Sequence, residues 1–136
     1  MENDMSIFLD ASFFLALYNE TDVHHKKAVA ISRRIDDGEF GGTLTSDDVF
    51  DEVISVALRK LGKPQAMGCG KNILESVMVM QGDTHLFHKG WNIFNTTKEN
   101  FSFTDCMIQA IIDLGEIDHI ATFDAAFGHL KIDVVQ

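Results

Sequence analysis

The stretch Ile7-Phe8-Leu9-Asp10-Ala11-Ser12 decides the fold of this 136-residue chain. Three consecutive apolar residues end at an acid, a pattern typical of a short strand that is buried on both faces. A strand of this kind needs helices on both sides of its sheet. The segment therefore predicts an α/β protein whose first strand lies inside a mainly parallel sheet.

Short apolar runs and helical patterns alternate along the rest of the chain, as expected for strands joined by crossover helices. The further strands are predicted at residues 43–45, 77–80, 120–122 and 134–135. Helices are predicted at residues 12–18, 22–35, 47–61, 84–95 and 103–114, with a short helical piece ending near Gly128 and a weak signal at 65–75. No linker-like tract divides the sequence, so residues 1–136 are expected to form one domain.

The charge is strongly acidic, with 21 Asp and Glu residues against 11 Lys and Arg residues and a formal net charge of −10. Such a balance excludes a general polyanion binder, because nucleic-acid binding normally needs a basic face. If the protein acts on a nucleic acid, divalent cations, a local basic stripe or a basic partner must offset the repulsion.

Targeting signals are not expected in this chain. Glu2 and Asp4 precede the first apolar run, where a signal peptide carries basic residues, and the run is too short for a membrane span. Cys69 and Cys106 are far apart and have no C-x-x-C neighbour, which favours reduced thiols. We therefore expect a cytoplasmic protein without membrane association.

Four acids stand near the carboxyl ends of predicted strands, the edge where parallel sheets bind ligands. They are Asp10, Glu52, Asp105 and Asp124. Each has a purely structural explanation when taken alone. Asp10 can simply end a strand, Asp105 can form a capping box with Ser102, and Asp124 can cap a helix. Glu52 can pair with Arg59 or point to solvent.

Taken together, these acids predict a cation site. Several carboxylates at one sheet edge repel one another, and their ionised forms are unfavourable unless a cation lies among them. Oxygen-only ligands favour Mg²⁺ or Mn²⁺. Such an ion lowers the pKa of bound water and neutralises charge on a phosphoryl group. Metal-dependent hydrolysis of phosphodiester bonds follows as the reaction class.

The sequence also resembles the PIN domain ribonucleases over nearly its whole length. Five segments in the expected order carry the resemblance: Ile7-Phe8-Leu9-Asp10-Ala11-Ser12, Asp22-x-x-His25-x-x-Ala28, Thr45-Ser46-Asp47-Asp48-Val49-Phe50-Asp51-Glu52-Val53, Phe103-Thr104-Asp105-Cys106 and Thr122-Phe123-Asp124-Ala125-Ala126-Phe127. The resemblance implies a three-layer fold with a five-stranded parallel sheet, Mg²⁺ or Mn²⁺ at the acidic cluster, and endonucleolytic cleavage of RNA.

By size, the chain is most similar to the VapC-like toxins of type II toxin–antitoxin pairs. This resemblance implies a homodimer and a small antitoxin partner. It assigns the catalytic and metal-holding roles to Asp10, Glu52, Asp105 and Asp124. It makes Ser12 and Thr122 the hydrogen-bonding residues that orient these carboxylates. Asp48 and Asp51 crowd Glu52, so helix phase alone leaves open whether one of them shares its role.

Other functions remain open from the sequence. An RNA-processing nuclease without a toxin role would carry the same acids, whereas an inactive PIN-like binding module would not need all four. A phosphoacceptor receiver domain also has a parallel sheet and an acidic Mg²⁺ pocket, but it needs an acidic pair after the first strand and a lysine after a late strand. Lys131 is the only late lysine, and it follows a helical stretch.

A group of aromatic residues occurs between positions 87 and 103, and two interpretations apply to it. The group comprises Phe87, Trp91, Phe94, Phe101 and Phe103. It can be a surface on which RNA bases stack. Helical spacing favours core packing or a dimer interface instead.

Overall fold

Strand β1 (Ser6–Leu9) is the central strand of the sheet in the computed structural model, which describes residues 5–128 and 132–136. Ile7 and Phe8 are fully buried and Leu9 is 3% exposed. The strand is flanked by parallel neighbours on both edges, so its backbone is hydrogen-bonded on both sides. The prediction of a strand buried on both faces is confirmed.

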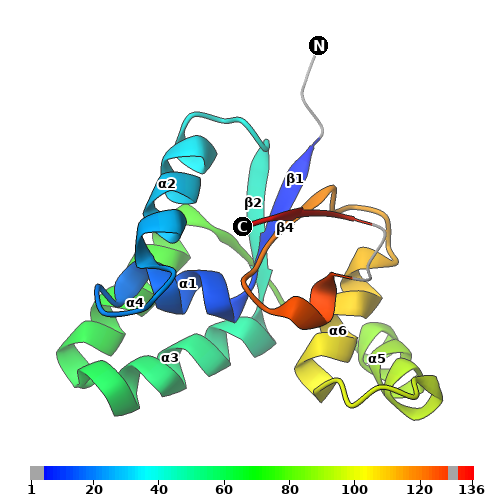
Figure 1. Cartoon of the computed structure of the whole chain (residues 1–136). Helices are drawn as coiled ribbons and strands as arrows, with labels where there is room; N and C mark the ends of the chain where they lie inside the picture. The colour runs from blue at the N-terminus through cyan, green and yellow to red at the C-terminus, as the bar shows by residue number, and fades with distance from the viewer. Residues whose placement is uncertain (1–4, 129–131) are drawn as a thin grey trace.

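Five parallel strands form the sheet, in the order β3-β2-β1-β4-β5. The remaining strands are β2 (Gly42–Ser46), β3 (Met78–Met80), β4 (His119–Ala121) and β5 (Asp133–Val135). The helices are α1 (Ala11–Tyr18), α2 (His25–Asp36), α3 (Asp47–Leu61), α4 (Lys63–Ser76), α5 (Thr84–Thr96) and α6 (Phe103–Ile112), with the 3₁₀ turn η1 (Ala125–Phe127). The predicted α/β fold is confirmed (Figure 1).

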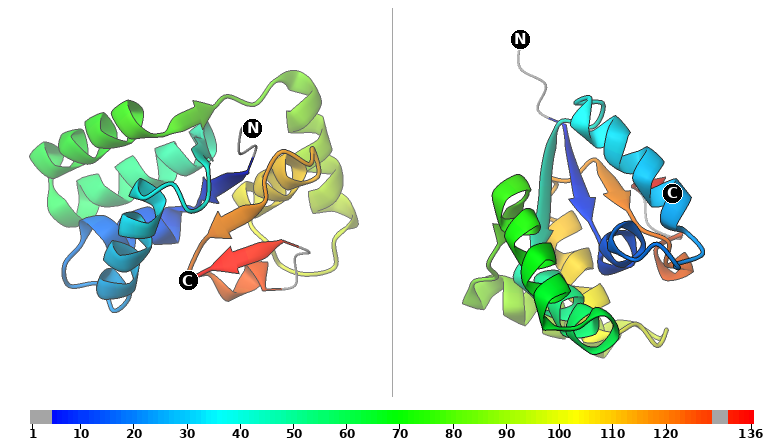
Figure 2. Two further views of the ribbon diagram at one scale, coloured as in Figure 1. Left: turned by 90° about the horizontal axis from the view of Figure 1, so that it is seen from above. Right: turned by 90° about the vertical axis from the view of Figure 1, so that its left-hand side faces the viewer.

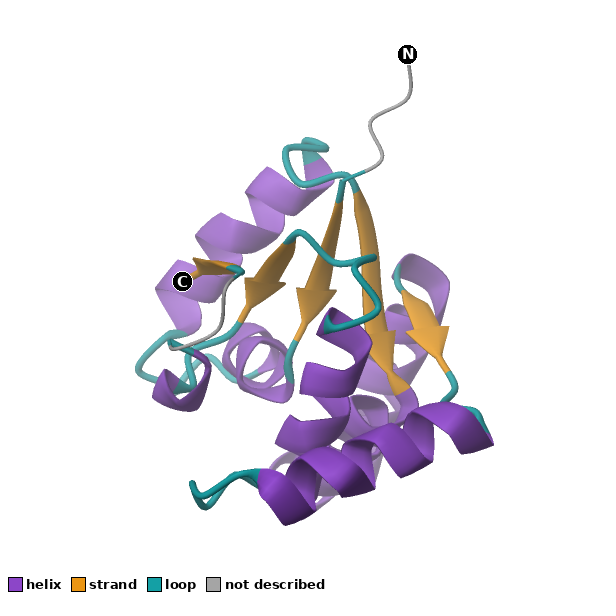
Figure 3. Ribbon diagram, turned by 90° about the vertical axis from the view of Figure 1, so that its right-hand side faces the viewer, coloured by secondary structure: helices purple, strands orange, loops and turns teal. Residues whose placement is uncertain are grey.

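The helices make two layers around the sheet, because the chain changes direction after β3. Successive strands β1, β2 and β3 move toward one edge, and the chain then returns past β1 to add β4 and β5. Right-handed crossovers place helices on opposite faces when this direction reverses. Figure 2 shows α1 to α4 gathered on one side of the sheet and α5 and α6 on the other. The central strands point toward the same end of the sheet (Figure 3).

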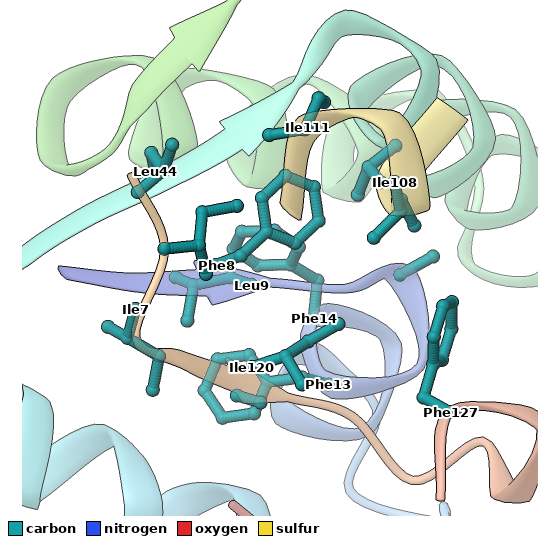
Figure 4. Packing of buried hydrophobic residues seen from close by; sticks show 14 of the residues in the cluster. Ile7, Phe8, Leu9, Phe13, Phe14, Leu44, Ile108, Ile111, Ile120 and Phe127 are labelled. Carbon is teal, nitrogen blue, oxygen red and sulfur yellow. The ribbon is translucent and has the colours of Figure 1, made fainter. Parts of the chain in front are cut away.

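The core fills the space between β1, β4 and the helices on both faces. Phe13 and Phe14 of α1 are each 2% exposed, and Ile108 of α6 and Ile120 of β4 are fully buried. Figure 4 shows these side chains packed on both sides of β1, which carries Ile7, Phe8 and Leu9. Burying a side chain of this size stabilises the fold by roughly 1.5–3 kcal/mol. The packing fixes the carboxyl end of β1 relative to α1, α6 and the segment after β4.

Helix α4 shows where the sequence signal is weak and packing prevails. Gly68 and Gly70 flank Cys69 and lower the helix propensity of this segment by about 1 kcal/mol each. The structure nevertheless forms an uninterrupted helix at Lys63–Ser76. A Cβ atom on Gly70 would lie 3.2 Å from Ile54 Cδ1 of α3, so the missing side chain permits a close approach of the two helices.

Helix α2 begins at His25, three residues later than the sequence predicts. Side chains in the preceding loop explain the difference, because they accept hydrogen bonds that helical backbone would otherwise make. Asn19 Oδ1 accepts from the backbone N of Thr21 at 3.1 Å, and Asp22 Oδ1 accepts from the backbone N of His24 at 2.8 Å. Asn and Asp commonly stabilise turns in this way.

The aromatic residues of α5 are not core residues, so that part of the sequence interpretation is wrong. Phe87, Trp91 and Phe94 are 52%, 49% and 43% exposed. Each of the three rings contacts Phe103 of α6, and Trp91 also stacks on Phe94, so they form an aromatic cluster on the surface. Helical spacing places residues on one face, but it does not say whether another element covers that face. The dimer-interface interpretation of these residues stays a prediction.

No helix in the part of the chain that the structure describes is long and apolar enough to cross a membrane. Cys69 and Cys106 are both buried free thiols. Glu2, Asp4 and Lys131, which the sequence interpretation used, lie outside the described residues.

Candidate active site

Asp10 lies at the carboxyl end of β1 and is 6% exposed. Its backbone stands at the N-cap position of α1, yet its carboxylate makes no capping hydrogen bond. Instead, Asp10 Oδ2 accepts a hydrogen bond from Thr122 Oγ1 at 2.7 Å. A buried carboxylate that is not used to cap its own helix is costly to keep ionised. This makes Asp10 the most unusual of the four acids.

Ser12 and Thr122 connect the end of β1 to the segment after β4. Their hydroxyl oxygens are 3.1 Å apart, and Ser12 Oγ lies 3.4 Å from Asp10 Oδ2. Ser12 Oγ also accepts from the backbone N of Phe123 at 2.9 Å, and Thr122 Oγ1 accepts from the backbone N of Asp124 at 3.0 Å. This network holds Asp10 and Asp124 in a fixed relation.

Burial raises the pKa of the Asp10 carboxyl to about 6. The hydrogen bond from Thr122 lowers the pKa but does not offset the burial, and repulsion from Asp105 and Glu52 raises it further. Coulombic effects between exposed charges are largely screened beyond about 8 Å in physiological salt. Asp10, Glu52 of α3 and Asp105 of α6 therefore lie near the same end of the sheet.

Glu52 reaches this region from α3, which begins because Ser46 Oγ accepts a hydrogen bond from the backbone N of Val49. Partial burial raises the pKa of Glu52, and repulsion from Asp105 and Asp124 raises it further. The neighbouring Asp48 also has a raised pKa, from partial burial and then from Asp47 and Asp51. Of these two acids, Glu52 is the one whose pKa is raised by other candidate residues.

Asp105 has the structural role that the sequence pattern indicates. Ser102 Oγ accepts from the backbone N of Asp105 at 3.0 Å, and Asp105 Oδ2 accepts from the backbone N of Ser102 at 3.2 Å, which completes a capping box. Partial burial raises the pKa of Asp105, the bonds to Ser102 lower it, and repulsion from Asp124 raises it. The carboxylate therefore both caps α6 and faces Asp124.

Asp124 also caps a helical turn, because its Oδ1 accepts from the backbone N of Ala126 at 2.9 Å. Its side chain is exposed. The structural explanations for Asp105 and Asp124 are thus real, but each capping bond uses one oxygen of a carboxylate that has two. Capping and ligand binding are compatible for these residues.

The four acids therefore lie close enough for electrostatic repulsion between them, but their side chains do not form a closed coordination site. Among residues 5–128 and 132–136, no three Asp, Glu, His or Cys side chains are close enough together to hold a metal ion. The chemistry of the donor set still suits a hard divalent cation, because it consists of carboxylate oxygens and includes one buried group. The ligand atoms that these residues offer are therefore of the type that Mg²⁺ and Mn²⁺ prefer.

Sequence reasoning named Thr122 as a hydrogen-bonding residue but missed the pairing of Phe123 with His24. Phe123 stacks on His24, with ring centroids 4.4 Å apart and planes 4° from parallel. No periodicity signal marks this pair, because both residues lie outside regular helices and strands. The role of Thr122 is expected from the resemblance to the PIN domain ribonucleases, and its hydroxyl donates to Asp10 Oδ2 in the structure.

Known proteins share this architecture. A VapC ribonuclease of Archaeoglobus fulgidus is 25% identical over 113 residues, which cover 80% of this chain and 71% of that protein. The structure of Mycobacterium tuberculosis VapC20, described as a sarcin-ricin loop cleaving toxin, matches with a TM-score of 0.80 and 24% identity, over 93% of this chain and 95% of that one.

A more distant match is VapBC2 from Rickettsia felis, solved with a DNA fragment from its promoter, at a TM-score of 0.71 and 10% identity over 96% and 97% of the two chains. At these identities the structural matches show a shared fold. The model of the PIN domain family matches residues 7–132, and a receiver domain is thereby set aside. The chain belongs to the PIN domain family.

Proposed function

We propose that this protein is an endoribonuclease that depends on Mg²⁺ or Mn²⁺, with Asp10, Glu52, Asp105 and Asp124 as the ion-holding and catalytic carboxylates. The observation that carries the proposal is the buried Asp10 carboxylate, which is held by Thr122 and is joined through Ser12 to the segment that carries Asp124. Burial, and then repulsion from Asp105 and Glu52, raises the pKa of this carboxylate. The similarity to a VapC ribonuclease and to an RNA-cleaving toxin supports RNA as the substrate.

A bound divalent ion would supply charge neutralisation at the phosphoryl group and a more acidic water. The chain's own residues prepare the site for this chemistry. Thr122 donates to Asp10 Oδ2, which orients the carboxylate. Ser12 links Thr122 to the backbone of Phe123, so the segment carrying Asp124 keeps its position. Carboxylates fixed in this way would hold a cation without rearranging during the reaction.

We further propose that the protein is the toxin of a type II toxin–antitoxin pair, acts in the cytoplasm and forms a homodimer. One of the similar structures is a toxin–antitoxin complex from Klebsiella pneumoniae, and another is VapBC2 from Rickettsia felis. The net charge of −10 suits a partly basic protein partner. RNA processing without a toxin role is the alternative.

Cleavage of a pool of single-stranded oligoribonucleotides tests the enzymatic proposal. The wild type should cut the pool with Mg²⁺ and lose this activity in EDTA. Asp10→Asn and Asp105→Asn should abolish cleavage, whereas Asp51→Asn, which removes the same charge from an exposed position of α3, should not. Mg²⁺-dependent cleavage retained in both Asp10→Asn and Asp105→Asn would contradict the assignment.

Copurification tests the toxin proposal separately. A small protein encoded beside this one should bind it and silence the cleavage, and light scattering of the free protein should give twice the 15.2 kDa chain mass. If no such neighbour inhibits the enzyme, RNA processing becomes the better interpretation.

A further inference from the structure

A cavity of 330 Å³ opens beside Asp124, between α1, the loop that follows it, α3 and the segment after β4. We call it the flank cavity. Ser12 and Asp124 line it and also belong to the acidic site, so the two are continuous. Its floor is apolar and is formed in part by Val53, Val56 and Ala57 of α3. An apolar floor with a few polar groups at the rim is typical of small-molecule pockets, and the volume is at the lower end of their range.

One wall of the flank cavity is a flat aromatic pair. His24 and Phe123 both line the cavity and stack face to face. Both rings are anchored through their backbones, because the N–H of His24 donates to Asp22 and the N–H of Phe123 donates to Ser12. Aromatic rings fixed in this way bind unpaired nucleic-acid bases, and each stacked base contributes roughly 1–3 kcal/mol.

Lys60 places a positive charge in the flank cavity, whose other charged lining residues are Asp124 and Asp22, the latter beside His24. Lys60 lines the cavity from α3, eight residues after Glu52, which corresponds to about 12 Å along the helix axis. In the described part of the chain, Lys60 takes part in neither of the ion pairs. An unpaired lysine beside a pocket attracts anions, and it is notable in a chain with a net charge of −10.

We propose that the flank cavity is a nucleotide subsite, in which a base packs against the His24–Phe123 pair and a backbone phosphate contacts Lys60. The inference rests on the proposed ribonuclease function, since the nucleotide is taken to flank the cleaved bond of the same RNA strand. The opposite charges of the acids and Lys60 set the strand's placement: the scissile phosphate lies at the acids with their cation, and a neighbouring phosphate lies at the lysine. His24, Phe123 and Lys60 are then substrate-binding residues.

Binding of nucleoside monophosphates tests the subsite without any cleavage. The wild type is titrated with AMP, GMP, CMP and UMP in EDTA, and the imidazole proton resonances of His24 are followed by NMR, with His24→Gln used for assignment. At least one nucleotide should shift these resonances in a saturable way. Lys60→Ala should weaken this binding at least fivefold, and Lys60→Arg should stay within about twofold of the wild type.

A matched control comes from Lys71, an exposed lysine of α4 that lines a separate groove over another face of α3. Lys71→Ala should leave nucleotide binding unchanged. Phe123→Ala should abolish the response of His24, because the stacking partner is lost. The subsite is overturned if no nucleotide perturbs His24, or if Lys60→Ala and Lys71→Ala bind equally well.

RNA cleavage separates this inference from the proposed function. With the oligoribonucleotide pool and Mg²⁺, Lys60→Ala should raise KM at least fivefold with little change in kcat, and Lys71→Ala should change neither. If the wild type cleaves RNA and Lys60→Ala has an unchanged KM, the subsite is wrong and the nuclease stands. If the wild type binds nucleotides at His24 but cleaves no RNA, the nuclease proposal fails and the nucleotide pocket stands.

Discussion

Replacing Asp10 by Asn should make the metal-free protein more stable at neutral pH, although it removes the proposed central carboxylate. Asp10 is 6% exposed, and burial raises its pKa from 3.8 to about 6. A carboxyl group whose pKa is raised by folding opposes folding when it ionises. The free energy of unfolding should therefore fall as the pH rises from about 4 through about 6, and then level off. An amide of nearly the same shape carries no charge and can still accept from Thr122.

The size of the effect follows from the pKa. Each pKa unit corresponds to about 1.36 kcal/mol, so the shift of Asp10 corresponds to at most about 3 kcal/mol above pH 7. For a chain of this length, that is a rise in Tm of roughly 10 °C. Urea unfolding and thermal scans in EDTA at several pH values between 4 and 8 measure it. Adding Mg²⁺ should reduce the difference in Tm between Asp10→Asn and the wild type, because an ion that binds only the folded wild type stabilises the wild type.

The control is Asp51→Asn, which removes one charge from an exposed position of α3. Its unfolding free energy should differ from that of the wild type by less than about 0.5 kcal/mol at every pH. The reasoning is refuted if Asp10→Asn is no more stable than the wild type at pH 7.5, or if the two stability curves run parallel from pH 4 to pH 8.

Three further outcomes are expected. Glu52→Gln should slow RNA cleavage at least about 100-fold while Asp48→Asn stays close to the wild type; equal losses would show that the segment does not act through Glu52 alone. Thr122→Val should raise the Mg²⁺ concentration for half-maximal cleavage about 10–100-fold, with Thr122→Ser restoring it, since the hydroxyl orients Asp10. Gly41→Ala should lower the urea midpoint far more than Gly38→Ala: both glycines have a φ near +80°, but of the two only Gly41 would bring a Cβ against a backbone oxygen, that of Met5.

The sequence by itself determined the fold class, the sheet and most helix positions. Short apolar runs such as residues 7–9 can be stable only when buried, and the helical segments between them allow parallel pairing. The position of an acid directly after such a run also indicates the ligand-binding edge, as for Asp10. Capping patterns are equally local, which is why the Ser102–Asp105 box is visible in the sequence and is present in the structure.

Tertiary structure decided what depends on distant neighbours. Gly68 and Gly70 argue against a helix locally, but close packing of α4 on α3 at Gly70 keeps the segment helical. The aromatic face of α5 is apolar in sequence, yet whether it is buried depends on elements elsewhere in the chain.

The candidate site also depends partly on local sequence and partly on tertiary structure. Residue types near strand ends suggested its acids, but only the folded chain joins Thr122 to Asp10 across 112 positions of sequence and lays His24 against Phe123. Local sequence patterns indicate which single segments are buried and where helices are capped. The pKa of Asp10 and the shape of the cavity beside it arise from residues that meet only after β1 and β4 have paired.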